Sequence, residues 1–134
     1  EDAQTQLFAN WDNLREMSSA GMHIGSHTST HSILSHLSLT EQKKEVIHSK
    51  QRLEQELSKV ITTIAYPVGN ETTFNETTIK IVKDAGYKLA FSFISGINTS
   101  LTPKHLFALK RLGIADNYTV EELKLHIISA KKAI

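Results

Sequence analysis

The stretch that decides the fold is Met22-His23-Ile24-Gly25-Ser26-His27-Thr28-Ser29-Thr30-His31-Ser32. Its first four residues are a short, mostly apolar run, which predicts a buried strand at residues 22–25. The polar residues that follow are poor helix formers, so they predict a loop just past the end of that strand. His27 and His31 lie in this loop, four residues apart.

Two histidines with this spacing can bind one metal ion from a loop that curls around it. A catalytic zinc or similar divalent ion needs three protein ligands and one open position for water. His27 and His31 supply two such ligands, and the residues around them show no third. The alternative is a solvated pair, because 7 histidines in 134 residues produce chance pairs. The remaining histidines have no comparable setting: His23, His36, His48, His105 and His126.

Helical and strand-like segments alternate along the rest of the chain. Helices are predicted at residues 10–19, after the capping boxes at 38–41 and 73–76, and from 119 onward; strands are predicted at 62–66, 89–94 and 108–115. The apolar face of the second helix is expected to hold Val46, Leu53, Leu57 and Val60. This alternation predicts an α/β fold with parallel strands, whose ligands gather at the carboxyl ends of the strands.

The length of the chain, 134 residues and 15.0 kDa, suits one domain. No linker, repeat or low-complexity segment divides it, so residues 1–134 are expected to form a single domain. The predicted elements supply about four strands, too few to close a barrel of about eight. We therefore expect an incomplete barrel, with bare strand edges through which two chains can pair as a homodimer.

Composition excludes several kinds of partner and site. The 15 basic and 14 acidic residues give a formal charge of +1, which offers no electrostatic support for nucleic acid as a partner. The absence of cysteine excludes a disulfide framework, a thiolate zinc site and a cysteine nucleophile. No apolar stretch approaches the roughly 20 residues of a membrane span, and residues 1–4 lack the features of a signal peptide.

Several segments together resemble the polysaccharide deacetylase family, the NodB-homology carbohydrate esterases. The most specific are Gly25-Ser26-His27-Thr28 with His31, followed by Ala65-Tyr66-Pro67-Val68-Gly69. The resemblance runs from Trp11 to about Ile127. It also includes Trp11-Asp12-Asn13-Leu14, Met17, Ser19 to Ile24, Ser49-Lys50, Leu53-Glu54, Ala85-Gly86-Tyr87 and Ala90-Phe91.

The resemblance implies a distorted (β/α) barrel that holds one divalent ion, zinc above all and otherwise cobalt or nickel. In the family an aspartate and two histidines bind this ion, and His27 and His31 match the histidines. The family's aspartates lie in an earlier Thr-Phe-Asp-Asp segment, which this sequence lacks, and Asp2 and Asp12 have different surroundings. The chain is thus expected to be the carboxyl-terminal portion of the domain, without its opening strands.

The turn that follows the strand at residues 62–66 matches a second functional segment of the family. There the backbone amide after the proline stabilises the oxyanion, so the amide of Val68 is the expected donor. Tyr66, Pro67 and Gly69 are expected beside the substrate. Unaided by the resemblance, a proline followed by glycine after a strand predicts only a loop.

Arg111 stands inside an apolar strand, where burial without an anionic partner is costly. It is expected to orient the aspartate that this chain lacks; the alternative is an ordinary surface charge at an edge strand. Aromatic platforms for sugar rings are expected among Tyr66, Phe91 and Phe93, although aromatic residues are more often core. The family's late Leu-x-His segment, which supplies the general acid, has no clear match.

The function implied is metal-dependent hydrolysis of N-acetyl or O-acetyl groups on an acetylated polysaccharide, with this chain alone expected to be inactive. A secreted, periplasmic or cell-envelope location is expected, with no signal in this chain. The main alternative is a non-catalytic carbohydrate-binding or assembly module on the same fold, which Val68 and the unmatched general acid favour. A doubly wound domain binding phosphate at a helix start is disfavoured, because no glycine-rich cradle follows a strand.

Overall fold

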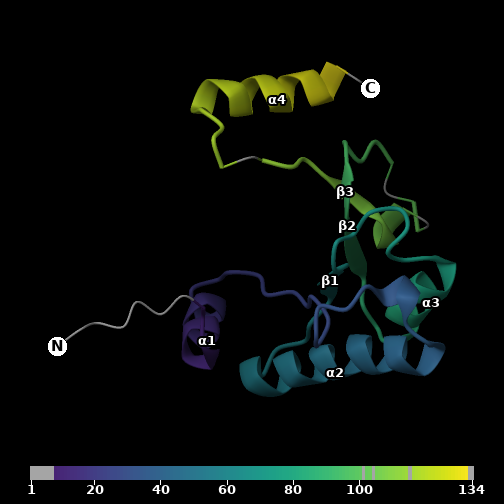
Figure 1. The fold of residues 1–134 in the computed structure, drawn as a ribbon. Coiled ribbons are helices and arrows are strands. Elements are labelled where there is room, and N and C mark those ends of the chain that lie inside the picture. The colour runs from purple at the N-terminus through teal and green to yellow at the C-terminus, as the bar shows by residue number, and fades with distance from the viewer. Residues whose placement is uncertain (1–7, 101, 104, 115, 133–134) are drawn as a thin grey trace.

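The structure, a computed structural model, describes residues 8–100, 102–103, 105–114 and 116–132. Four α-helices, three β-strands and two 3₁₀ helices make up the described chain (Figure 1). In chain order they are α1 (Trp11–Ser19), η1 (Leu34–His36), α2 (Leu39–Leu57), β1 (Thr63–Ala65), α3 (Glu76–Asp84), β2 (Leu89–Ser95), η2 (His105–Phe107), β3 (Leu109–Arg111) and α4 (Val120–Lys132).

The three strands form one parallel sheet in the order β1-β2-β3. Ile64 of β1 pairs with Ala90 of β2, and Phe91 of β2 pairs with Leu109 of β3. On the other side of β1, Ser26 forms a parallel bridge to Ile64. The expected α/β fold without a closed barrel is therefore confirmed for the described residues. Because every pairing is parallel, the chain leaves all of these segments at the same edge of the sheet.

The strand expected at residues 22–25 is not formed; a single bridge at Ser26 takes its place. The Ser26 amide donates to the Thr63 carbonyl and the Ala65 amide donates to the Ser26 carbonyl, each at 2.9 Å. A strand needs such ladder bonds at successive residues, and here one residue makes them. Gly25 nevertheless lies so close to Thr63 that an added Cβ would stand 2.5 Å from the threonine Oγ1. The expected β3 is also shorter than 108–115.

The helices begin where capping side chains satisfy their free amides. Ser38 and Glu41 form the expected capping box of α2, with the Ser38 amide 2.9 Å from the Glu41 carboxylate. Helix α3 starts later than expected, because the Asn75 side chain accepts from the Thr78 amide at 3.0 Å. Thr73, the cap expected there, instead donates its hydroxyl to the Asn70 carbonyl.

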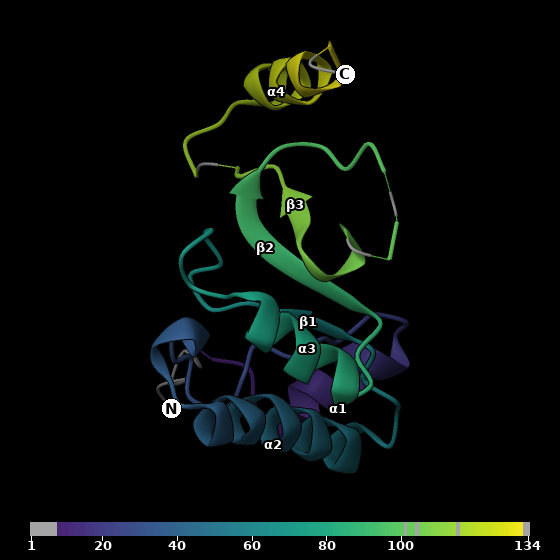
Figure 2. The same cartoon turned by 90° about the vertical axis from the view of Figure 1, so that its right-hand side faces the viewer.

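The core lies between the sheet and the helices α2 and α3, which pack against each other (Figure 2). Its fully buried members come from each of these elements and from η1: Leu34, Val46, Ile64, Val82 and Ala90. Val60, expected on the apolar face of α2, is 75% exposed. Helix α2 ends at Leu57, and Ser58 in a left-handed conformation turns the chain away from that face.

Helix α4 lies apart from the sheet in both views (Figures 1 and 2). Among the described residues, no helix is long and apolar enough to cross a membrane. Pairing of two chains through strand edges stays a prediction.

Candidate functional site

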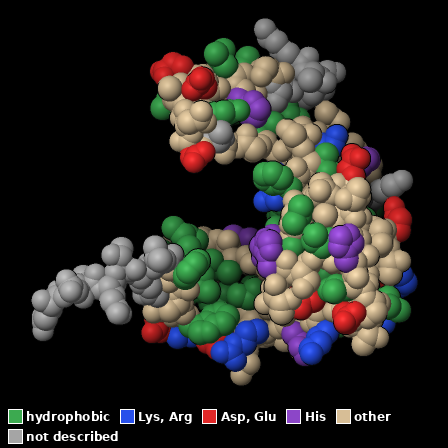
Figure 3. Space-filling view, in the orientation of Figure 1, with side chains coloured by type: hydrophobic (Ala, Val, Ile, Leu, Met, Phe, Trp, Pro, Cys, Tyr) green, Lys and Arg blue, Asp and Glu red, His purple; other side chains and the backbone are tan. Residues whose placement is uncertain are grey.

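His27 and His31 come together at the carboxyl edge of the sheet. Their ring centroids are 4.8 Å apart and the rings meet edge to face at 71°. Both side chains are exposed, and Figure 3 shows histidine side chains at the surface beside the deep notch below α4. The loop that carries them contains no helix, as expected from its sequence.

The backbone of β1 sets the orientation of the His27 ring. The Nδ1 atom of His27 lies 2.8 Å from the carbonyl oxygen of Ala65. Because a carbonyl can only accept, Nδ1 carries the proton, and in the neutral ring Nε2 keeps a free lone pair. Histidines that bind metals are commonly held this way, with one ring nitrogen donating to a carbonyl and the other on the ion. The pair therefore fits two ligands of a divalent ion.

The part of the chain that the structure describes places no third ligand beside this pair. Within the described ranges, no group of three or more histidine, cysteine, aspartate or glutamate side chains is placed to hold a metal. Asp12 is in α1, where it pairs with Arg15 at 2.7 Å. Asp2 lies outside the described residues. The described part of the chain thus offers two donors, one fewer than a catalytic ion requires.

The turn after β1 holds a strained residue, Val68. Val68 has φ +60°, which is rare for a β-branched residue and costs on the order of 1–3 kcal/mol. Its side chain is 48% exposed, and no described residue accepts a hydrogen bond from its amide. Gly69 holds the turn in place, since its carbonyl accepts from the Phe93 amide at 2.7 Å. A free, positioned amide is what an oxyanion site needs.

Three neighbours of Val68 that were expected to meet substrate are buried. Tyr66 is 1% exposed, its hydroxyl donates to the Phe107 carbonyl at 2.9 Å, and its ring stacks on Phe74. Pro67 and Gly69 are also buried. Their burial leaves Val68 as the exposed residue of the turn, while Tyr66 serves as a core residue rather than as a platform.

Arg111 and Phe93 form a second pair at the same edge of the sheet. The Arg111 Nε donates to the Ser92 carbonyl at 2.6 Å, and its guanidinium lies 5.2 Å from the centre of the Phe93 ring. Phe93 is 61% exposed, whereas Phe91 is half-buried. Of the three expected platforms, Phe93 is the most exposed.

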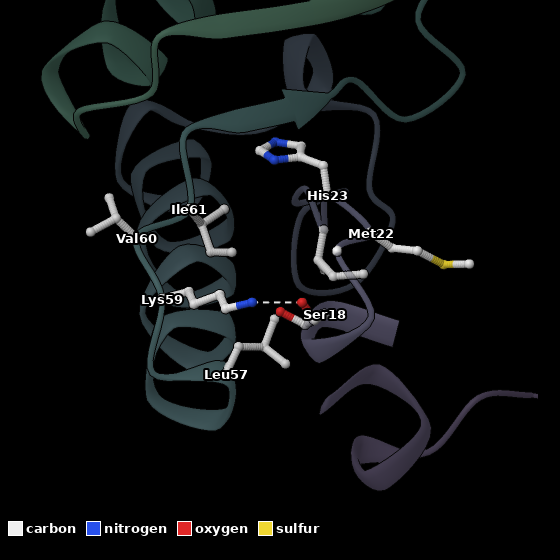
Figure 4. Close-up of a pocket in the computed structure, with 9 residues that line it drawn as sticks. Ser18, Met22, His23, Leu57, Lys59, Val60 and Ile61 are labelled. Atoms are coloured by element: carbon white, nitrogen blue, oxygen red, sulfur yellow. Dashed lines mark hydrogen bonds between the residues drawn. The ribbon is translucent and has the colours of Figure 1, made fainter. Parts of the chain in front are cut away.

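Two of the cavities border successive parts of the segment at residues 21–29. One, of about 330 Å³, is bordered by His27, Ser29, Trp11 and Arg52 among others, and so opens beside the pair. The other, of about 230 Å³, is drawn in Figure 4 and contains His23 and Lys59. This second cavity lies next to residues 59–61, which enter β1, and therefore at the opposite edge of the sheet from the pair.

Glu45 is the residue of the site that the sequence analysis missed. It is 9% exposed, and its carboxylate accepts hydrogen bonds from the loop that carries the histidines. Burial raises its pKa, but the hydrogen bonds from Thr30 and Ser29 outweigh burial and leave the pKa below its ordinary value. A signal was present in the sequence: Glu45 directly precedes the apolar residue Val46, at the border of the face of α2 expected to be buried.

The lowered pKa of Glu45 predicts a loss of stability in acid. The pKa of Glu54 is also lowered, by hydrogen bonds from Lys50 and the Ile61 amide. A carboxylate whose folded pKa is lowered stabilises the protein above its unfolded pKa of about 4.3, and this contribution disappears as the pH falls through the folded pKa. We expect the urea midpoint to fall between pH 5 and pH 3, and to fall less in Glu45→Gln. If the urea midpoint falls equally with pH in the wild type and in Glu45→Gln, the lowered pKa does not belong to Glu45.

Comparison with known proteins agrees with this geometry. The sequence profile of the family described as "Polysaccharide deacetylase" matches residues 3–90. The chain belongs to the polysaccharide deacetylase family. The matched range contains the histidine loop and the Pro67 turn. The protein YxkH of Bacillus subtilis (strain 168) is 28% identical over 120 residues, which cover 90% of this chain and 41% of that protein.

Solved polysaccharide deacetylases share the fold. The deacetylase PplD of Streptococcus pyogenes, solved in complex with acetate, superposes with a TM-score of 0.81 at 29% identity, covering 92% of this chain and 52% of that one. A polysaccharide deacetylase from Bacillus cereus gives a TM-score of 0.80 at 26% identity, covering 92% and 38%. The chain thus spans about half, or less, of the length of these relatives.

Proposed function

We propose that this chain carries part of the active site of a metal-dependent polysaccharide deacetylase, which hydrolyses N-acetyl or O-acetyl groups on a sugar polymer. The observation that carries the proposal is the convergence of His27 and His31 at the same sheet edge as the exposed residue Val68, from whose amide no described residue accepts a hydrogen bond. Water adds to the acetyl carbonyl, the bond to the sugar nitrogen or oxygen breaks, and acetate leaves. PplD, itself a deacetylase, was solved with acetate.

His27 and His31 are proposed as two ligands of one divalent ion, with zinc, cobalt and nickel as the ions to test. A bound divalent ion supplies a water of lowered pKa and a polarised carbonyl. The Ala65 carbonyl holds the His27 ring so that Nε2 is free for binding. The third ligand and the general base are proposed to be carboxylates in a segment that this sequence does not contain, so that this chain alone is inactive.

The remaining residues of the edge are proposed to act on the substrate. The Val68 amide donates to the oxygen that becomes negatively charged as the carbonyl is attacked, and one such preorganised donor contributes on the order of 3 kcal/mol. Phe93 offers its exposed face to a sugar ring, and Arg111 lies against that ring from the other strand. Because a long polymer does not cross a membrane, we propose that the enzyme acts outside the cytoplasm.

The test is acetate release from a chitin oligosaccharide and from acetylated xylan by the full-length protein that contains this chain. We expect release that depends on zinc, cobalt or nickel. His27→Ala and His31→Ala are each expected to lower the rate by about 100-fold or more, since loss of one ligand disrupts a three-ligand site. His36→Ala is the matched control, because His36 is also exposed but lies in η1. Release that survives both substitutions would refute the proposal.

A non-catalytic module on the same fold is the second candidate. One observation in its favour is that the described residues bring together two metal donors rather than the three that a catalytic ion requires. The other is that Val68 is not the aromatic residue usual in the family. Binding of the oligosaccharide without acetate release, with each of the three metals, would support this candidate over the enzyme.

A further inference from the structure

The loop that carries the two histidines has a strained backbone. Thr28 has φ +67° and His31 has φ +60°, and both conformations are unfavourable for residues other than glycine. Each costs on the order of 1–3 kcal/mol and persists only where surrounding contacts enforce it. Because His31 is itself one of these residues, the direction of its side chain depends on whatever holds the loop.

The contacts that hold the loop come mainly from one carboxylate. The Oε2 atom of Glu45 accepts from the backbone amides of Ser29 and Thr30, at 2.9 and 2.8 Å. The Oε1 atom accepts from the Thr30 hydroxyl at 3.0 Å, and the Glu45 carbonyl accepts from the Ser29 hydroxyl at 3.3 Å. Successive amides that converge on one oxygen form an anion-binding nest, and here the anion belongs to the protein itself.

The buried face of α2 is polar where it meets this loop. Glu45 and Ser49 are both buried on α2, although a helix normally buries apolar side chains. The Ser49 hydroxyl lies 2.8 Å from that of Ser26, the residue that precedes His27. Glu45 thus holds the middle of the loop and Ser49 its beginning, while the imidazoles of His27 and His31 stay exposed.

We propose that Glu45 is a positioning residue, which keeps the loop in the strained conformation that brings His27 and His31 together. This inference rests on the proposed function insofar as it concerns metal affinity. The charge of Glu45 is matched by backbone and hydroxyl donors, and no basic side chain of the described residues donates a hydrogen bond to it. Its carboxylate is therefore committed to the loop.

The experiment compares Glu45→Ala, Glu45→Gln and the control Glu54→Ala in the full-length protein. Glu54 is also on α2 and also accepts a backbone amide, that of Ile61 at 3.0 Å, but it does not contact the histidine loop. Three quantities are measured: the affinity for Co²⁺, the hydrogen-exchange rates of the Ser29 and Thr30 amides, and the nuclear Overhauser effect between the two imidazole rings. Urea unfolding reports the stability of each variant.

In Glu45→Ala we expect the Co²⁺ affinity to fall by about 10-fold to 100-fold, as for other residues that orient metal ligands. The two amides are expected to exchange at least about tenfold faster, because their opening no longer breaks hydrogen bonds to a buried acceptor. Glu45→Gln keeps an oxygen acceptor and is expected to restore most of both properties. Glu54→Ala is expected to lose stability while keeping the affinity and the exchange rates of the wild type.

Two outcomes would overturn the inference. One is a Glu45→Ala protein whose Co²⁺ affinity and amide exchange match those of Glu54→Ala. The other applies if the wild type binds no Co²⁺, a result that refutes the proposed function by itself. The nuclear Overhauser effect between the two imidazole rings then tests the positioning role. Its persistence in Glu45→Ala refutes that role, whereas its loss in Glu45→Ala but not in Glu54→Ala supports it.

Discussion

Replacing Tyr66 with alanine is expected to lower the free energy of unfolding by about 3–5 kcal/mol, the usual cost of removing a large buried aromatic side chain. Tyr66 is 1% exposed and its ring stacks on Phe74 with centroids 4.2 Å apart. The ring lies next to Pro67, so its loss also frees the turn that carries Val68. Urea unfolding at pH 7 measures the change in stability.

Tyr66→Phe separates the ring from the hydroxyl. It keeps the stacking on Phe74 but leaves the Phe107 carbonyl without the donor that lies 2.9 Å away. A buried carbonyl left unpaired costs about 1–3 kcal/mol. We expect Tyr66→Phe to be more stable than Tyr66→Ala by the difference between these two costs, which is the contribution of the ring. Two variants of equal stability would show that the hydroxyl alone matters and that the ring contributes little.

Replacing Gly69 with alanine is expected to disrupt the turn beside the histidines. Gly69 has φ +72°, and an added Cβ would lie 2.7 Å from the Phe93 nitrogen and 3.1 Å from the Tyr66 carbonyl oxygen. The left-handed backbone alone costs about 1–2 kcal/mol, and crowding in a packed site adds about 1–3 kcal/mol. The measurements are urea unfolding and, in the full-length protein, acetate release, which falls if the Val68 amide moves.

Gly21→Ala is the matched control for this substitution. Gly21 has φ +93°, but an added Cβ would meet no atom within 4 Å. Its replacement therefore carries the backbone cost without the crowding, and we expect the smaller loss of about 1–2 kcal/mol. If the two alanine variants lose the same stability, the close approach of Gly69 to Phe93 has no energetic consequence.

Local sequence signals predicted most of the elements. The Ser38–Glu41 capping box marks the start of α2, and the alternation of strands and helices predicted a parallel sheet. Such signals act over three or four residues, so they are visible without knowledge of the fold. Where two local signals competed, the prediction failed: Asn75, not Thr73, caps α3, because the Thr73 hydroxyl bonds to the Asn70 carbonyl.

Part of the site was predicted because it too depends on local features of the sequence. The spacing of His27 and His31 and the Pro67 turn are local features, and the structure brings both to one sheet edge. The sequence left Tyr66 open between a sugar platform and a core residue, and the contact that places it in the core is with Phe107, 41 residues away. Glu45 was missed because a glutamate in an amphipathic helix is usually exposed, and its loop partners are 15 and 16 residues away.

The amino-acid sequence thus determined the starts of α1, α2 and α4 and the spacing of the two histidines, because each depends on neighbours within a few residues. The alternation of helices and strands along the chain indicated the parallel arrangement. Folding decided which of these residues meet. The ring of His27 is oriented by a carbonyl 38 residues away, and the strained loop is held by a carboxylate from another helix. Contacts of this kind form only when the chain is packed, and spacing along the sequence does not encode them.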